Sequence, residues 1–120
     1  MSIKVLEAIS RPMFIAGLLG LFGCATPPPM LYGWGSYQQQ VYEYLKGENN
    51  GPQAQLAALE TDLQQFDAKG LAHPPGLHAH IGLLYASMGK SADAVQEFET
   101  EKSLFPESAQ YIDFLLSNKR

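Results

Sequence analysis

The sequence has little positive charge, a single cysteine and no long alternation of polar and apolar residues. Its 120 residues contain 8 Lys and Arg against 12 Asp and Glu, which gives a net charge of −4. Nucleic-acid-binding proteins carry a basic face, so this charge argues against them. One cysteine cannot build an internal disulfide framework. Apolar residues make up 46% and charged residues 17%, which is the balance of a globular domain.

Motifs that carry catalysis are also missing. The sequence contains no phosphate loop and no zinc-protease motif, and Ser36 lacks the second flanking glycine of a nucleophile elbow. Three acidic side chains near residue 100 are expected to form a solvated face rather than an acid/base pair. They are Glu97, Glu99 and Glu101. We therefore predict neither an enzyme nor a cofactor site.

The three histidines lie close together in the sequence, at His73, His78 and His80. On a helix, residues two positions apart point about 200° apart, so His78 and His80 cannot easily share one ion. Helical histidine ligands are usually four positions apart, and no second cysteine is present to complete a site. We predict no metal site. His78 is expected to be packed and His80 to be solvated.

The N-terminus has the features of an export signal over residues 1–23. Residues 12–22 are uncharged, and a run of this length is too short to cross a hydrocarbon core, which takes about 20 residues. The following Leu21-Phe22-Gly23-Cys24 resembles the bacterial lipobox, although Phe22 is bulkier than is usual there. The resemblance implies that Cys24 is acylated and begins the mature chain. The alternatives are an uncleaved apolar anchor and a cysteine buried in a helix.

Residues 24–36 are predicted to form a tether. Ala25 stands where Gram-negative lipoproteins held in the inner membrane usually have Asp, so the resemblance implies the outer membrane, facing the periplasm. Pro27, Pro28 and Pro29 favour a semi-rigid polyproline II spacer. Acyl chains on Cys24 would be the contact with the membrane.

The remaining residues, 37–120, predict an all-α domain of short antiparallel helices separated by glycine and proline. Ser36 and Ser91 are the expected N-caps of the first and fourth helices. Apolar residues recur at helical spacing in five segments, which are 37–46, 52–69, 77–88, 92–104 and 108–118.

The third and fourth segments resemble one tetratricopeptide repeat, a helical hairpin of about 34 residues. Small residues at Gly82 and Ala94 would let the two helices approach closely, with Tyr85 and Phe98 filling the gap between them. Glu101 stands where the repeat prefers Ala, which should weaken the contact with the next helix. The matching positions are Ile81, Gly82, Tyr85, Gly89, Ala94, Phe98 and Pro106.

Aromatic residues gather between residues 32 and 44. They could pack on the core or the membrane interface, or they could form a docking strip, since aromatic side chains are common in interface hot spots. The concave face of a tetratricopeptide-like stack is lined by the first helix of each pair. The resulting partner-binding candidates are Tyr32, Trp34, Tyr37, Gln40, Tyr44, His80, Leu84 and Met88.

Four runs carry a wider resemblance, namely LYGWGSY at 31–37, VYEYLKG at 41–47, PPGLHAH at 74–80 and FETEKSLFPES at 98–108. Together they resemble a proteobacterial family of small lipoproteins known as a domain of unknown function. The resemblance implies envelope proteins as partners, including a curli-secretion-type pore lipoprotein and another small lipoprotein. We expect a non-catalytic assembly factor for an envelope or secretion complex. The alternative is a lipoprotein that binds peptidoglycan or a small ligand through its Tyr/Trp-rich segment.

Overall fold

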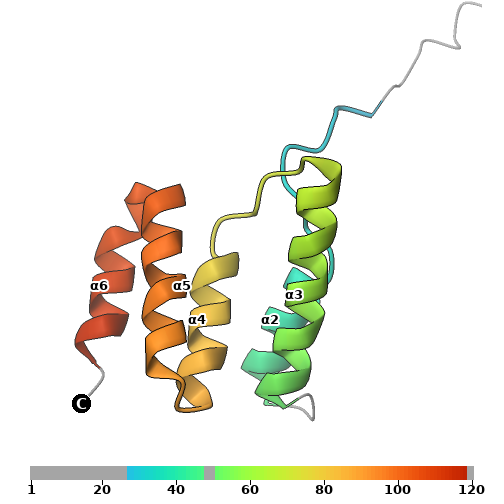
Figure 1. Ribbon diagram of the computed structural model, residues 1–120. Coiled ribbons are helices and arrows are strands. Elements are labelled where there is room, and N and C mark those ends of the chain that lie inside the picture. Colours follow the sequence, from blue (N-terminus) through green and yellow to red (C-terminus); the bar gives the residue numbers. More distant parts are fainter. Residues whose placement is uncertain (1–26, 48–50, 119–120) are drawn as a thin grey trace, which may run out of the picture.

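The computed structural model describes residues 27–47 and 51–118. This part of the chain is helical, and within it no strand is present, so the predicted all-α class is confirmed. The predicted signal 1–23 and Cys24 lie outside the described residues. The helices are α2 (Tyr37–Lys46), α3 (Pro52–Lys69), α4 (Leu77–Ser87), α5 (Ser91–Leu104) and α6 (Ala109–Ser117), with a 3₁₀ turn η1 (Pro106–Ser108) before α6 (Figure 1).

The helix ends lie within a residue or two of their predicted places, and of the two predicted serine N-caps only Ser36 occupies the N-cap position. α5 begins at Ser91 itself, with Lys90 in the N-cap position. Ser36 occupies the N-cap position of α2 without making a side-chain cap. Its hydroxyl instead donates to Asp62 Oδ2 at 2.6 Å, because α3 places a stronger acceptor beside it. Among the described helices, none combines the length and the apolar character needed to cross a membrane.

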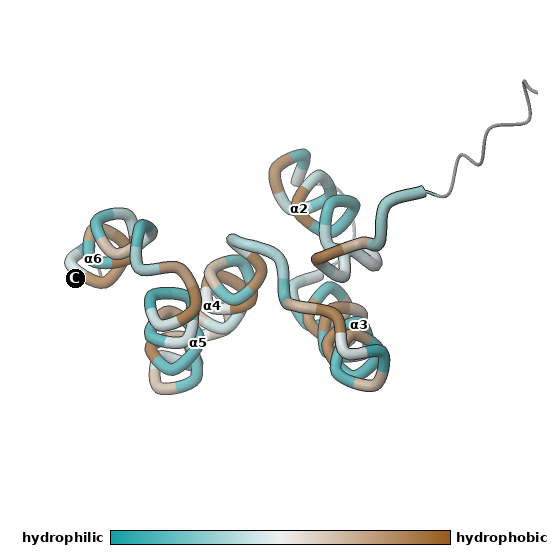
Figure 2. Tube along the Cα trace, turned by 90° about the horizontal axis from the view of Figure 1, so that it is seen from above, coloured by the Kyte–Doolittle hydropathy of each residue, from teal (hydrophilic) through white to brown (hydrophobic). Residues whose placement is uncertain are grey.

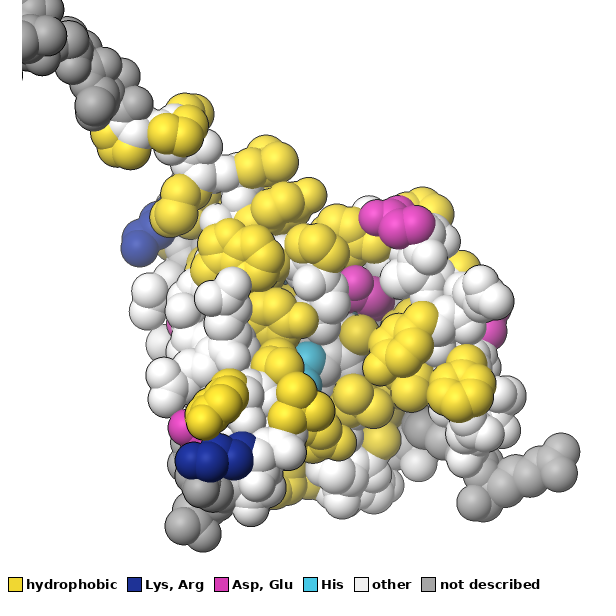
Figure 3. All heavy atoms as spheres, turned by 180° about the vertical axis from the view of Figure 1, so that it is seen from behind, with side chains coloured by type: hydrophobic (Ala, Val, Ile, Leu, Met, Phe, Trp, Pro, Cys, Tyr) yellow, Lys and Arg dark blue, Asp and Glu magenta, His cyan; other side chains and the backbone are white. Residues whose placement is uncertain are grey.

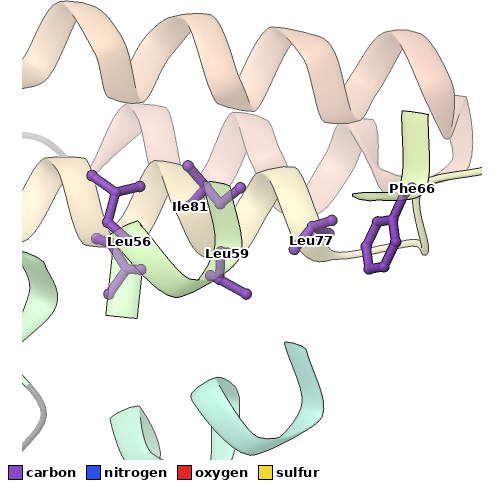
Figure 4. Close-up of a cluster of buried hydrophobic side chains, with 6 residues drawn as sticks. Leu56, Leu59, Phe66, Leu77 and Ile81 are labelled. Atoms are coloured by element: carbon purple, nitrogen blue, oxygen red, sulfur yellow. The ribbon is translucent and has the colours of Figure 1, made fainter. Parts of the chain in front are cut away.

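The helices form two staggered rows when viewed end-on, with α2, α4 and α6 in one row and α3 and α5 in the other (Figure 2). The main core cluster lies between α3 and α4 (Figure 4). Burying each large side chain there contributes roughly 1.5–3 kcal/mol. The cluster consists of Leu56, Leu59, Phe66, Leu77, Ile81 and Leu84.

α4 packs most extensively on α5, at the hairpin that resembles the tetratricopeptide repeat. A methyl group added to Gly82 would lie 2.6 Å from the ring of Phe98, so the backbone of α4 rests directly on that ring. Ala94 is fully buried, and Tyr85 packs against the core on both sides of α4. These contacts confirm the predicted close approach and the gap-filling roles of Tyr85 and Phe98.

Glu101 corrects the expectation of a solvated acidic face. Its side chain is 2% exposed, and its carboxylate accepts hydrogen bonds from the backbone N–H groups of Gly76 and Ala79. The first N–H groups of a helix have no partner within the helix, and the helix dipole favours a negative charge there. A glutamate on α5 therefore caps α4 where the repeat usually has an alanine.

Residues 31–36, assigned to the tether from the sequence, contact the helical domain. The N–H of Gly33 donates to the carbonyl of Ala72 at 2.9 Å, and the N–H of Ala72 donates to the carbonyl of Leu31 at 3.2 Å. The N–H of Ser36 donates to Asp62 Oδ2 at 2.7 Å. These bonds hold the aromatic segment against α3 and the loop before α4.

Candidate functional site

An apolar groove of about 230 Å³ opens on the face formed by α2, α4 and α6. Figure 3 shows this face, where hydrophobic side chains surround a hollow with a histidine at its base. The groove runs along the row of first helices, as expected for the concave face of a tetratricopeptide-like stack. Its lining residues are Tyr37, Val41, Tyr44, Leu45, Gly76, Ala79, His80, Leu83 and Tyr111.

Two faces of α4 are apolar, and they serve different purposes. One face carries Leu77, Ile81 and Leu84 into the core against α3. The other carries Ala79 and Leu83, which line the groove and also pack in the second core cluster with α5 and α6. Because both stripes are apolar, the periodicity of the sequence cannot tell which of them borders the groove.

Gly76 lets the chain enter α4 beside the groove. Its φ is +89°, a conformation that residues with a side chain rarely adopt, and an added methyl group would lie 2.6 Å from the Tyr37 hydroxyl. Glycine at this position therefore brings α2 and the start of α4 together on one groove wall.

His80 lines the groove and is 5% exposed, which corrects the expectation that it is solvated. Burial lowers the pKa of its imidazole below the ordinary 6.5, so the ring is neutral at pH 7. Within the described residues, its Nε2 has no hydrogen-bond partner. A buried nitrogen without a hydrogen-bond partner costs free energy. The ring packs edge-to-face against Tyr44, with centroids 5.1 Å apart.

The aromatic residues predicted from the sequence form a continuous row that leads into the groove. Tyr32 contacts Trp34 edge-on, Trp34 stacks on Tyr37 at 6.3 Å, and Tyr37 lies 6.2 Å from His80. Trp34 remains 39% exposed despite this stacking. Burial and the nearby carboxylate of Glu101 raise the pKa of Tyr37, so its phenol stays protonated and can donate a hydrogen bond. The row thus packs on the domain and still offers exposed ring surface.

Five of the eight partner-binding candidates do not line the groove. Tyr32 and Trp34 belong to the aromatic row beside it. Leu84 is fully buried in the α3–α4 core, and Met88 packs against the same cluster. Gln40 is buried as well, at 7% exposure. Helical spacing alone does not show which face of each helix is buried, and Leu84 and Gln40 lie on buried faces. The groove residues that were not among the candidates are Val41, Leu45, Gly76, Ala79, Leu83 and Tyr111.

A second polar cluster lies at the α3–α4 junction and joins four side chains in a chain of contacts. His73 Nε2 lies 3.0 Å from Asp67 Oδ1, and His73 Nδ1 lies 2.9 Å from His78 Nε2. His78 Nδ1 lies 2.6 Å from Glu97 Oε2. The predicted packing of His78 is confirmed, but Glu97 is partly covered and bonded rather than fully solvated. In the described part of the chain, no three His, Cys, Asp or Glu residues are grouped as a metal centre would require.

Comparison with known proteins identifies the domain but assigns it no activity. Residues 31–115 match the family model described as Domain of unknown function (DUF4810). The chain belongs to this family. The DUF4810 match begins at Leu31, the residue whose carbonyl first bonds to the domain, so the aromatic row is part of the DUF4810 domain. No curated protein and no solved structure matches the chain.

Proposed function

We propose that this DUF4810 protein is an outer-membrane lipoprotein that docks a segment of an envelope protein in the groove between α2, α4 and α6. The role is assembly or stabilisation of an envelope complex, without catalysis. The observation that carries this proposal is the apolar groove with exposed aromatic side chains at its rims.

Surface chemistry supports a peptide-like partner. Tyr44 and Leu45 on α2 and Tyr111 on α6 are exposed at the groove rims, where water would otherwise contact their apolar atoms. Grooves of this kind commonly receive the apolar face of a helix, and large aromatic side chains supply most of the energy at such sites.

The membrane anchor in this proposal is acylated Cys24, on the strength of its resemblance to a lipobox. The described residues support such a tether in one respect, because Pro27, Pro28 and Pro29 are exposed and have no regular hydrogen-bonded structure. The wider family resemblance suggests that the docked segment belongs to a curli-secretion-type pore lipoprotein or another small lipoprotein.

Site-specific photocrosslinking in intact cells tests the docking. A photoreactive phenylalanine analogue replaces Tyr44 on the groove wall or, as a control, Val95 on α5. These residues have nearly equal exposure, 38% and 40%, and only Tyr44 lines the groove. We expect a discrete crosslink from position 44 to an apolar segment of one envelope protein, identified by mass spectrometry, and none from position 95.

A crosslink of equal yield from both positions, or one only from position 95, would show that the groove is not the docking site. Metabolic labelling with a palmitate analogue tests the anchor separately. Label should enter the wild-type protein and be lost in Cys24→Ala. An unlabelled wild-type protein would remove the lipoprotein part of the proposal and leave the groove part standing.

A second candidate function, binding of a cell-wall fragment, is favoured by one observation. One face of the Trp34 ring stacks on Tyr37, yet the side chain keeps more than a third of its surface exposed. Sugar rings stack on exposed indoles in this way. Because Trp34 is the chain's only tryptophan, soluble peptidoglycan fragments should shift its fluorescence if this function is correct. An unchanged spectrum at saturating fragment, together with a crosslink from position 44, would favour protein docking.

A further inference from the structure

Exposed apolar side chains gather where the tether joins the domain. Met30 and Leu31 are 67% and 70% exposed, and Leu104, the last residue of α5, is 49% exposed. Each of the two leucines is followed by an aromatic residue, and the rings of those residues, Tyr32 and Phe105, lie 6.4 Å apart. Two segments that are distant in the chain therefore meet in one apolar surface. We call these five residues the tether-end patch.

The tether-end patch lies at one end of the helical stack. The C-terminal ends of α3 and α5 lie at this end, as does the point where residues 27–30 leave the domain (Figure 1). None of the five patch residues lines the groove between α2, α4 and α6. The patch is therefore a second apolar surface, separate from the proposed docking site, and its leucines remain exposed to water.

The tether limits how far this end of the domain can lie from a membrane. Cys24 is six residues before Met30, and six extended residues span at most about 22 Å. An acylated Cys24 would therefore hold the tether-end patch close to the bilayer, whereas the C-terminal end of α2 lies at the opposite end of the domain (Figure 1). Tyrosine side chains favour the boundary between headgroups and acyl chains, because the ring is apolar and the hydroxyl is polar.

Charge does not account for a membrane contact at this end. Exposed charged residues near the patch include Asp67 and Lys69 in the last turn of α3 and Glu107 in η1, so both signs are present. Segments that bind anionic lipids by charge need several basic residues together. The contact is therefore expected to come from apolar side chains and not from attraction to charged headgroups.

We propose that the tether-end patch rests on the phospholipid surface that holds the acyl anchor, with Leu31 and Leu104 inserted at the level of the headgroups. This inference rests on the acyl anchor of the proposed function and does not depend on docking in the groove. It sets the orientation of the domain, because α3 and α5 then stand across the membrane plane with their C-terminal ends toward it (Figure 1). The groove opens sideways, where a partner can approach along the membrane (Figure 3).

Fluorescence quenching by brominated lipids tests the contact at single positions. With Cys24 acylated, an introduced cysteine is the only free thiol of the chain, and it can carry an environment-sensitive dye. The acylated protein is labelled at Leu31→Cys, Leu104→Cys or Val95→Cys and reconstituted in vesicles of phosphatidylethanolamine and phosphatidylglycerol brominated near the headgroups. Val95 is the matched control, because it is 40% exposed on the same helix and lies about 13 Å further from the membrane end.

We expect bromine to reduce the emission at positions 31 and 104 by roughly half and to leave that at position 95 nearly unchanged. Adding Leu31→Asp should relieve the quenching at position 104, because it places a charge in the patch. Leu45→Asp charges a leucine of similar exposure on the groove rim and should leave the quenching at position 104 unchanged.

Quenching at position 31 alone would overturn the inference, because the tether by itself keeps that residue near the bilayer. Equal quenching at positions 95 and 104 would also overturn it, since the domain would then have no preferred end toward the membrane. Intact mass spectrometry measures the acylation separately. A chain without the acyl mass would refute the anchor and this inference together, whereas an acylated chain with position 104 unquenched would refute this inference and leave the proposed function standing.

Discussion

The carboxylate of Glu101 lies 2.7 Å from the backbone nitrogen of Gly76, so α5 supplies the acceptor that closes the N-terminus of α4. A second bond, to the nitrogen of Ala79, is 3.3 Å long. α4 forms one wall of the groove and also packs against α3 in the core. The contact with Glu101 therefore fixes the position of α5 relative to α4 and, through α4, relative to α3.

Replacing Glu101 with Ala should therefore destabilise the domain substantially. Hydrogen bonds to a charged group contribute about 1.5–3 kcal/mol each, so we expect a loss of roughly 2–4 kcal/mol in the free energy of unfolding. Urea denaturation followed by circular dichroism measures it. Glu99→Ala is the control, because that residue is exposed and only forms a 3.5 Å ion pair with Lys102. The free energy of unfolding of Glu99→Ala should fall by no more than about 0.5 kcal/mol. Equal losses in the two variants would contradict the capping role of Glu101.

The burial of His80 predicts acid sensitivity. Burial lowers the folded-state pKa of His80 below its ordinary value of 6.5, so below pH 6.5 the unfolded chain binds the proton more readily than the folded one. Stability should fall as the pH drops from 6.5 through the lower folded pKa, with no contribution from this group above 6.5. Comparing unfolding curves of the wild type and His80→Gln at pH 7.5 and pH 5.5 isolates the effect, since His73 and His78 are present in both. If the free energy of unfolding fell by the same amount between pH 7.5 and pH 5.5 in both proteins, the acid sensitivity would not come from His80.

The close approach of α4 and α5 predicts the effect of a methyl group at Gly82. Alanine is favoured over glycine inside a helix by about 1 kcal/mol, but here its Cβ would lie 2.6 Å from the buried ring of Phe98. Overpacking costs about 1–3 kcal/mol, so we expect Gly82→Ala to lower thermal stability despite its better helix propensity. Gly51→Ala has no atom within 4 Å of the added methyl and should leave the melting temperature nearly unchanged. A stabilised Gly82→Ala variant would show that the hairpin is looser than described.

Asp62 fixes the aromatic row to α3 through its two bonds from Ser36. In Asp62→Ala the partly buried N–H of Ser36 loses its acceptor, and the segment before α2 should move away from α3. The solvent accessibility of Trp34, measured by acrylamide quenching of the only tryptophan, should then increase. Gln64→Ala changes an exposed position on the same helix and should leave the quenching as in the wild type. Unchanged quenching in Asp62→Ala would mean that ring stacking alone holds the segment.

Much of the fold was predictable from local patterns. Apolar residues at helical spacing, bounded by glycines and prolines, placed α2 and α3 nearly to the residue. The small residues at Gly82 and Ala94 indicated the tight α4–α5 hairpin, since their spacing reflects contacts within one hairpin. The aromatic row could also be predicted from the sequence, because most of its members are close together in the chain.

The candidate site was only partly predictable. Of the candidates, Tyr37, Tyr44 and His80 line the groove, whereas Leu84 is buried in the core, Met88 packs against it and Gln40 is buried. Periodicity identifies a helix face but not its neighbour. On a helix with two apolar faces, such as α4, only the packed partners tell core from groove.

Local patterns in the sequence were enough to locate the helix ends and the close approach of α4 and α5, because those features depend on residues within one helix or one hairpin. Only the folded structure shows that His73 meets His78, that Glu101 caps α4 and that α6 completes the groove. These contacts join residues on different elements, or on a loop and a helix. These contacts depend on how the helices pack, and the spacing of residues within one segment does not predict that packing.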